Sequence, residues 1–235
     1  MKKAGIAVGR LAEEEVAHIL SGVIPSTGPD NPIADWTWRC TPTAIELWAP
    51  LTSALSSRES LVAAGGALVN LRILIRARGV VPDTRLLPDA KRPDLIAAVR
   101  PLNTGGASER DRALATAVQL YPAPPRAAGP ASADALTSLR HVARSERAWM
   151  GLIPTGMQPL GQTVEGEFVV IGTVLDGATA RLQAGQATHR VLHTATVDGV
   201  TAVVVAGALL TPDDRLKLRL QLGSGLWPQA VLRVG

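Results

Sequence analysis

The sequence predicts an α+β fold, because helix-type and strand-type patterns both recur along its 235 residues. Residues 11–20 place apolar side chains at helical spacing beside three consecutive acidic residues, an arrangement typical of an amphipathic helix. Residues 36–40 and 44–48 are short runs rich in aromatic and β-branched residues around a three-residue turn, which predicts an antiparallel hairpin. The length fits one substantial domain or a duplicated pair of small ones.

The other elements follow from capping and spacing signals. A long helix is predicted to start at Ser56, which forms a capping box with Glu59, and to end at Gly79. Gly65 and Gly66 lie inside this helix and favour a close approach of another backbone. Gly22 and Pro25 are predicted to end the first helix. The remaining patterns predict, in order, a strand at 81–87, a short helix at 93–99, a helix at 132–143, a strand at 168–174, a helix capped by Asp176 and running to about 196, a helix at 213–222 and a closing strand at 227–234.

Residues 121–130 form a proline-rich connector, YPAPPRAAGP. We therefore expect a single domain, residues 1–235, built from internal halves 1–120 and 131–235. An irregular loop is expected at 24–35, where prolines and a glycine exclude a continuous helix or central strand.

Composition excludes several classes of function. The net charge is +4 and the pI about 9.8, but the basic residues are scattered and no run of five occurs, so nucleic acid is not an expected partner. The sequence has no uninterrupted apolar stretch of about 18 residues, so no membrane span is predicted. The N-terminal residues do not form a secretory signal, which favours the cytoplasm. The single cysteine, Cys40, excludes an internal disulfide and a cysteine-based zinc site.

Few residue patterns indicate chemistry by themselves. His189 and His193 are four residues apart, as in helical metal sites, but no third ligand accompanies them, so a packed or solvated pair is favoured and no metal is predicted. Ser26 has no histidine and aspartate pattern to activate it as a nucleophile. Trp36 and Trp149 are the candidates for stacking on a planar cofactor, against the alternative of core packing. No catalytic residue is assigned.

Two blocks of the sequence resemble the flavin-dependent nitroreductase family, in its Acg-type mycobacterial and actinobacterial branch. The first is WTWRCTPTAIELWAPLTSALSSRESLVAAGGALVNLRILIRARG, residues 36–79, in which Arg58, Glu59 and the segment 66–68 carry the match. The second extends from Val169 to Gly235 and contains a T-x-x-D strand end, AGQATHRVL and PQAVLRVG. The blocks occur in the family's order.

This resemblance implies a nitroreductase-like fold with a central antiparallel sheet flanked by helices, in which one polypeptide mimics the two subunits of ordinary nitroreductases. It implies FMN as cofactor, NAD(P)H as electron donor and a small nitro- or quinone-type acceptor, with a homodimer or a related subunit as a possible partner. Cofactor-binding positions carried over from the motifs are Ser26, Asn31, Trp36, Arg58, Gly185, Gln186 and Arg233.

A second interpretation is a degenerate relative that is flavin-free or sequesters flavin, and that acts as a binding or partner subunit. The family's PSxHNxQPW motif appears here as PSTGPDNPIADW, without the histidine and with an insertion. The segment between Ala143 and Glu167 is shorter than in the family, and no arginine-containing tail follows Gly235. Arg10, Arg58 and Arg233 are the candidate substitutes for the phosphate ligands.

Overall fold

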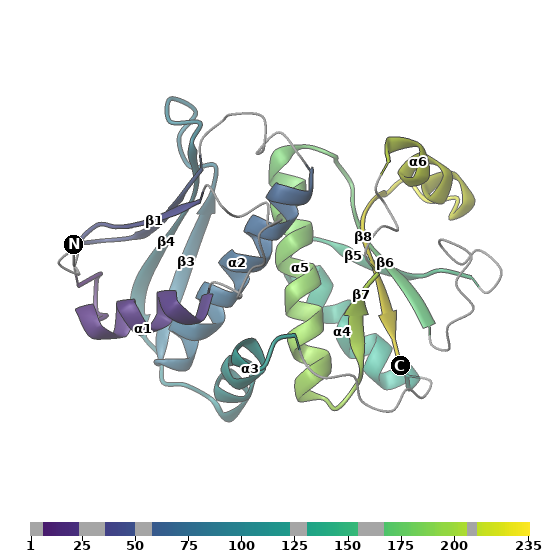
Figure 1. Cartoon of the computed structure of the whole chain (residues 1–235). Coiled ribbons are helices and arrows are strands. Elements are labelled where there is room, and N and C mark those ends of the chain that lie inside the picture. Colours follow the sequence, from purple (N-terminus) through teal and green to yellow (C-terminus); the bar gives the residue numbers. More distant parts are fainter. Residues whose placement is uncertain (1–6, 24–35, 50–57, 123–130, 155–166, 206–210) are drawn as a thin grey trace. The chain divides into compact units, whose positions relative to one another are not determined.

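The computed structural model describes residues 7–23, 36–49, 58–122, 131–154, 167–205 and 211–235 (Figure 1). The chain divides into two compact parts, Met1–Tyr121 and Pro122–Gly235, which we call the N-terminal unit and the C-terminal unit. Each unit contains its own four-stranded antiparallel sheet. The α+β class is therefore confirmed, with two sheets in place of the one central sheet that the resemblance implied.

The N-terminal unit is a helix, a hairpin, a long helix, a second hairpin and a closing helix. Its sheet has the strand order β1-β2-β4-β3, and all neighbouring strands are antiparallel. One face of the sheet is fully buried through Ile45, Leu47, Ala97 and Val99. The elements are α1 (Glu13–Val23), β1 (Thr37–Cys40), β2 (Ile45–Trp48), α2 (Arg58–Ala77), β3 (Val80–Leu86), β4 (Leu95–Thr104) and α3 (Glu109–Gln119).

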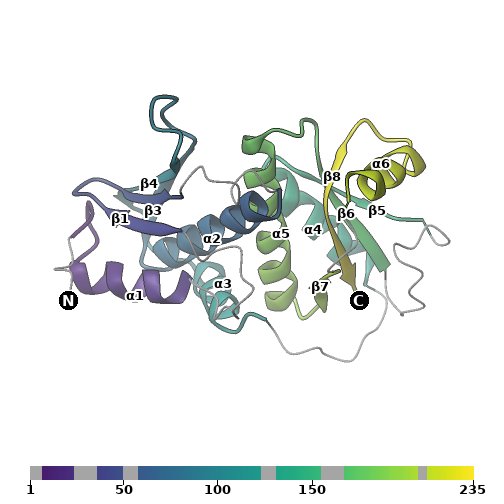
Figure 2. The same ribbon diagram turned by 45° about the horizontal axis from the view of Figure 1, so that its top comes forward.

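In the C-terminal unit the sheet has the order β5-β6-β8-β7 and has helices on both faces (Figure 2). Helix α5 contacts β6, β7 and β8 on one face, while α6 packs its Leu218 against Phe168 and Val231 on the other. The elements are α4 (Ala133–Ser145), β5 (Trp149–Leu152), β6 (Glu167–Thr173), α5 (Ala178–Val197), β7 (Ala202–Val204), α6 (Pro212–Gln221) and β8 (Trp227–Val234).

The two units have the same topology. Each runs helix, strand, strand, 20-residue helix, strand, strand, and each sheet places its first, second, fourth and third strands side by side. The long helices also share a local sequence, since Ala64-Gly65-Gly66-Ala67 of α2 corresponds in position to Ala184-Gly185-Gln186-Ala187 of α5. The chain is therefore an internal duplication at the level of structure.

Most predicted elements are confirmed within one to three residues at their ends, including the first hairpin and the four helices that became α1, α2, α4 and α5. The helix predicted at 213–222 and the strands predicted at 81–87, 168–174 and 227–234 are also confirmed. The expected loop at 24–35 and the capping residue Ser56 lie outside the described residues.

The short helix predicted at 93–99 is wrong, because residues 95–99 belong to β4 and the two before them form a turn. Residues Leu95 to Val99 are all buried, and β4 is a central strand that pairs with both β2 and β3. A strand covered on both faces reads as a continuous apolar run, which periodicity cannot distinguish from a short buried helix. Helix α3 and strand β5 were not predicted at all.

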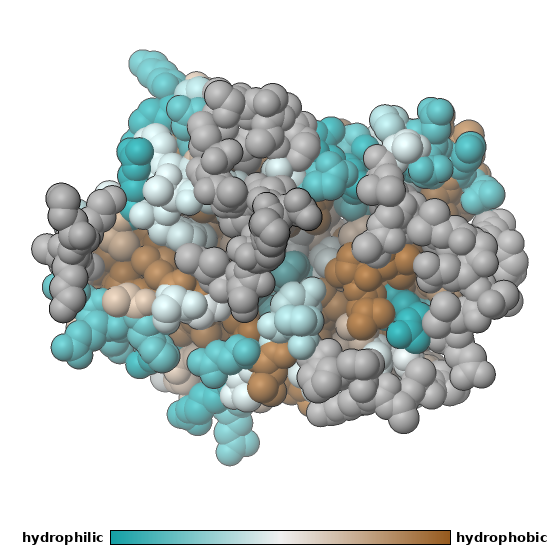
Figure 3. Space-filling model, in the orientation of Figure 1, coloured by the Kyte–Doolittle hydropathy of each residue, from teal (hydrophilic) through white to brown (hydrophobic). Residues whose placement is uncertain are grey.

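Helix α1 extends to Val23 in the described residues, one residue past Gly22, which with Pro25 was predicted to end it. A Cβ atom at Gly22 would lie 3.2 Å from Leu74 Cδ1 of α2, closer than ordinary van der Waals contact. The glycine therefore also permits close packing of α1 on α2. The opposite side of α1 is hydrophilic, as Figure 3 shows.

Replacing Gly22 by leucine is expected to lower the free energy of unfolding by about 1 to 3 kcal/mol, because the added carbons must displace the buried Leu74. Urea unfolding measures the change. The control is Ser21→Leu on the exposed neighbouring position, which should stay within about 0.5 kcal/mol of the parent. Equal effects of the two substitutions would contradict the packing role of Gly22.

Helix α2 is also long and apolar enough to cross a membrane by length and composition. In the structure, however, 72% of the relevant window is buried within the protein, as is usual for the core helix of a compact domain.

Candidate functional site

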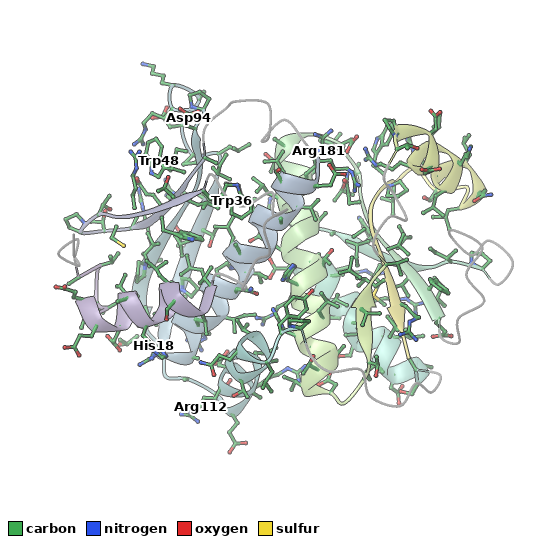
Figure 4. The ribbon with its side chains drawn as sticks, in the orientation of Figure 1. His18, Trp36, Trp48, Asp94, Arg112 and Arg181 are labelled. Atoms are coloured by element: carbon green, nitrogen blue, oxygen red, sulfur yellow. The ribbon has the colours of Figure 1, made fainter. Side chains whose placement is uncertain are left out.

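Two of the predicted cofactor-binding residues are described in the N-terminal unit. Trp36 immediately precedes β1 and is half-buried (Figure 4). Arg58 is the first residue of α2, and its Nη2 atom lies 2.7 Å from Oε1 of Glu59. The guanidinium is therefore already in an ion pair with its neighbour. Ser26 and Asn31 lie outside the described residues.

The other three predicted residues lie in the C-terminal unit, where Arg233 is not brought to the same sheet face as Gly185 and Gln186. Gly185 and Gln186 are buried in the middle of α5. Arg233 lies on β8 two residues after Val231, which packs against Leu218 of α6. Because side chains alternate along a strand, Arg233 points to the face that α6 occupies, while α5 contacts the opposite face.

Thr188 is a further residue of this segment that sequence reasoning missed. Its side chain is 3% exposed, and its Oγ1 atom has no hydrogen-bond partner within the described part of the chain. Other helical threonines behave differently: Thr116, Thr137 and Thr196 donate to the carbonyl four residues earlier, at 3.2, 2.9 and 3.0 Å. A buried hydroxyl without a partner costs about 1 to 3 kcal/mol, so such a group indicates a missing ligand or water.

The histidine pair lies on the same helix. The rings of His189 and His193 have centroids 5.9 Å apart in an edge-to-face arrangement. Burial lowers the pKa of His193 to about 3, helped by the nearby charges of His189 and Arg190, and burial lowers the pKa of His189 to about 4. Among the described residues, no group of three potential metal ligands is present. With these lowered pKa values both imidazoles are neutral at pH 7.

Asp176 is the centre of a polar cluster and not a helix cap. The N-cap of α5 is Gly177, while Oδ1 of Asp176 accepts from Arg215 Nη2 at 2.7 Å and from Gln229 Nε2 at 2.9 Å. Arg181 Nε approaches the same oxygen at 3.5 Å. Partial burial would raise the pKa of Asp176, but the hydrogen bonds from Arg215 and Gln229 outweigh it and hold the pKa at about 2.

The cluster joins the T-x-x-D and PQAVLRVG motifs. Gln229 Nε2 also donates to Oγ1 of Thr173 at 3.0 Å, and Arg215 Nε donates to the carbonyl of Pro228 at 3.0 Å. The end of β6, helix α6 and the start of β8 are thereby held together. The geometry gives both motifs a structural role within the C-terminal unit.

The sheet of the N-terminal unit has a charged hollow on its outer face. Ala98 forms part of the floor, with Glu46 on β2 and Arg85 on β3 paired to either side of it. The hollow has a volume of about 210 Å³ and is also lined by Arg100. Beyond it, the Arg39 guanidinium lies 4.4 Å from the centre of the Trp48 ring. Among the described lining residues, three arginines face two carboxylates, those of Glu46 and Asp89, so positive charge is in slight excess.

Comparison with known protein families and with curated protein sequences finds no match for this chain. The candidate site therefore depends on the residues themselves and on their geometry.

Proposed function

We propose that this protein is a nitroreductase-like oxidoreductase that passes electrons from NAD(P)H through FMN to a nitro- or quinone-type acceptor, and that the AGQAT segment of α5 lies against the flavin. The observation that carries this proposal is the buried, unpartnered hydroxyl of Thr188. It lies three residues after Gly185, so both positions share one face of the helix. Glycine has no Cβ, so Gly185 would let a flat ring approach the helix. The unsatisfied hydroxyl of Thr188 would then bond to the polar edge of that ring.

The residues of α5 therefore fit the ring of the cofactor. Bound FMN would supply the redox chemistry, accepting a hydride and returning electrons to the acceptor. The chain itself would orient the ring through Thr188 and through close approach at Gly185. No acid or base group of the protein is required, which agrees with the neutral state of the nearby histidines. A cytoplasmic location belongs to the same proposal.

The duplicated topology supports the proposal as well. The resemblance implied one polypeptide that mimics two subunits, and the two units have the same strand order and matching long helices. A scaffold resemblance alone does not give an activity, so the test must address the flavin directly.

A second candidate function is a flavin-free relative that acts as a binding or partner subunit. The predicted phosphate ligands favour this second function. Arg58 is paired with Glu59, and Arg233 points to the sheet face opposite α5. A flavin phosphate would then need a cation from elsewhere.

FMN titration of the purified full chain, followed by quenching of flavin fluorescence, tests the proposal. Saturable stoichiometric binding is expected, followed by NAD(P)H oxidation with a nitroaromatic or quinone. Thr188→Val is expected to weaken FMN binding about 5- to 10-fold, because a hydrogen bond in a buried site is lost. The matched control is Thr196→Val, whose hydroxyl bonds within the helix, and it should leave FMN affinity unchanged.

Three results would count against this assignment. Failure of the parent protein to bind FMN would remove the reductase and favour the partner-subunit function. Equal FMN affinity in Thr188→Val would place the flavin away from α5. A gain of about 1 kcal/mol in the stability of flavin-free Thr188→Val, without any effect on FMN, would mean that the hydroxyl is an unsatisfied core group.

A further inference from the structure

A second hollow lies on the face of the C-terminal sheet against which α6 packs. It is separate from the proposed flavin position on α5, which contacts the opposite face. It lies between β5 and the chain that follows α6, with a volume of about 160 Å³. Trp149 forms one wall although its side chain is 43% exposed, and Leu226 forms another. An indole and several aliphatic side chains thus remain accessible around an open hollow.

Two glycines shape the floor of this hollow. Gly172 on β6 pairs opposite Trp149, and a Cβ atom there would lie 3.3 Å from Leu226 Cβ, so glycine makes room for that wall. Gly151 on β5 pairs opposite Val170, and within 4 Å its added Cβ would meet Val170 Cγ1 at 3.8 Å. The space above Gly151 is therefore real volume that a side chain could occupy without a clash.

The lining selects for a neutral ligand. In the part of the chain that the structure describes, no charged side chain lines the hollow, so a carboxylate or ammonium group would lose its hydration without compensation. Among the described lining residues, Ser224 alone carries a side-chain hydroxyl, and Trp149 carries an indole N–H. Arg144 lies 5.0 Å from the centre of the Trp149 ring but is not part of the lining, so it supports the wall from outside.

Volume sets the size of the ligand. Apolar cavities of about 150 Å³ bind one benzene ring, whereas the three fused rings of a flavin need far more room. Offset or edge-to-face contact with Trp149 would favour an aromatic ring over a saturated one. We propose that this hollow is a binding site for a neutral, single-ring aromatic compound that carries one hydrogen-bonding substituent directed at Ser224.

Phenol, toluene and benzoate serve as probes in ligand-observed NMR titrations of the full chain. Phenol and toluene are expected to bind with dissociation constants on the order of 0.1 to 1 mM, a range appropriate to ligands of this size. Benzoate should bind at least about tenfold more weakly because its carboxylate would be desolvated. Absence of saturable phenol and toluene binding at concentrations about tenfold above that range would overturn the proposal.

Two variants locate the binding. Gly151→Val should fill the hollow and reduce the affinity for both phenol and toluene at least about tenfold. Gly225→Ala is the matched control, since a Cβ there meets no atom within 4 Å and Gly225 is not part of the lining. Unchanged binding to folded Gly151→Val would also overturn the proposal.

Ser224→Ala provides a test that does not depend on the strand. It is expected to weaken phenol binding about threefold to tenfold and to leave toluene binding unchanged, because toluene makes no hydrogen bond. This comparison decides the matter if circular dichroism shows that Gly151→Val is not folded. Equal loss, or no loss, for both ligands would contradict the assignment of Ser224.

Discussion

Replacing Arg215 by methionine is expected to lower the free energy of unfolding by about 2 to 4 kcal/mol. Arg215 is 8% exposed, and its guanidinium holds both Asp176 and the carbonyl of Pro228. Methionine keeps much of the packing volume but leaves the carboxylate and the carbonyl short of donors. Urea unfolding at pH 7 measures the loss, and an unchanged slope with denaturant would show that the unfolded state is the same.

Arg219→Met is the control on the same helix. Arg219 lies 4.0 Å from the centre of the Trp227 ring, is half-buried and donates one hydrogen bond of 3.3 Å, to the carbonyl of Gly225, so its loss should cost about 1 kcal/mol. Similar losses in the two variants would mean that the Asp176 cluster contributes no more than a surface contact.

Acid should narrow the difference in stability between the two variants. The pKa of Asp176 is about 2, below its ordinary value of 3.8, so its stabilising contribution is complete above pH 4 and is lost as the pH falls toward 2. In Arg215→Met the pKa of Asp176 should return toward its ordinary value. The variant should therefore lose less of its remaining stability than the parent over this interval.

Lowering the pH from 7 to 5 is expected to destabilise the protein through its buried histidines. Both have folded-state pKa values below 6.5, so the unfolded chain binds protons that the folded chain does not, and stability falls as the pH drops through 6.5. For His193 the loss should reach about 2 kcal/mol at pH 5. The effect of His189 should be smaller, because part of that residue remains exposed.

His193→Gln removes this titration and should flatten the dependence of unfolding free energy on pH between 7 and 5 by about 2 kcal/mol. The comparison is with His141→Gln, in which an exposed histidine of α4 is replaced. Parallel pH profiles for the parent and His193→Gln would show that His193 is not buried as a neutral group.

Sequence reasoning succeeded where a local signal and burial on one side coincide. The first hairpin and the long helices had turn residues, caps and a clear period, and the structure confirms them. It failed at residues 93–99, where apolar side chains are buried on both faces of the sheet. It also missed α3, because Asp111 completes the capping box with Ser108 where a glutamate or glutamine is usual. Strand β5 is too short and too exposed to show a period.

The candidate site was harder to predict than the fold. The AGQA match pointed to Gly185 and Gln186, which lie on α5, but Thr188 becomes notable only when its hydroxyl is seen to lack the usual bond within the helix. Asp176 looked like a cap in sequence, because the partners that define its role, Arg215 and Gln229, are remote along the chain. Hydrogen bonding between distant residues cannot be read from local spacing.

Duplication within one chain gives each copy a freedom that a symmetric dimer lacks. In a homodimer every substitution appears twice and must suit both environments, whereas here each copy can change alone. Gly66 of α2 has its counterpart in Gln186 of α5, and the connection that forms turns at 87–94 contains helix α6 in the other copy. One copy could therefore acquire a ligand pocket or a new hydrogen-bonding residue while the other preserved the ancestral packing.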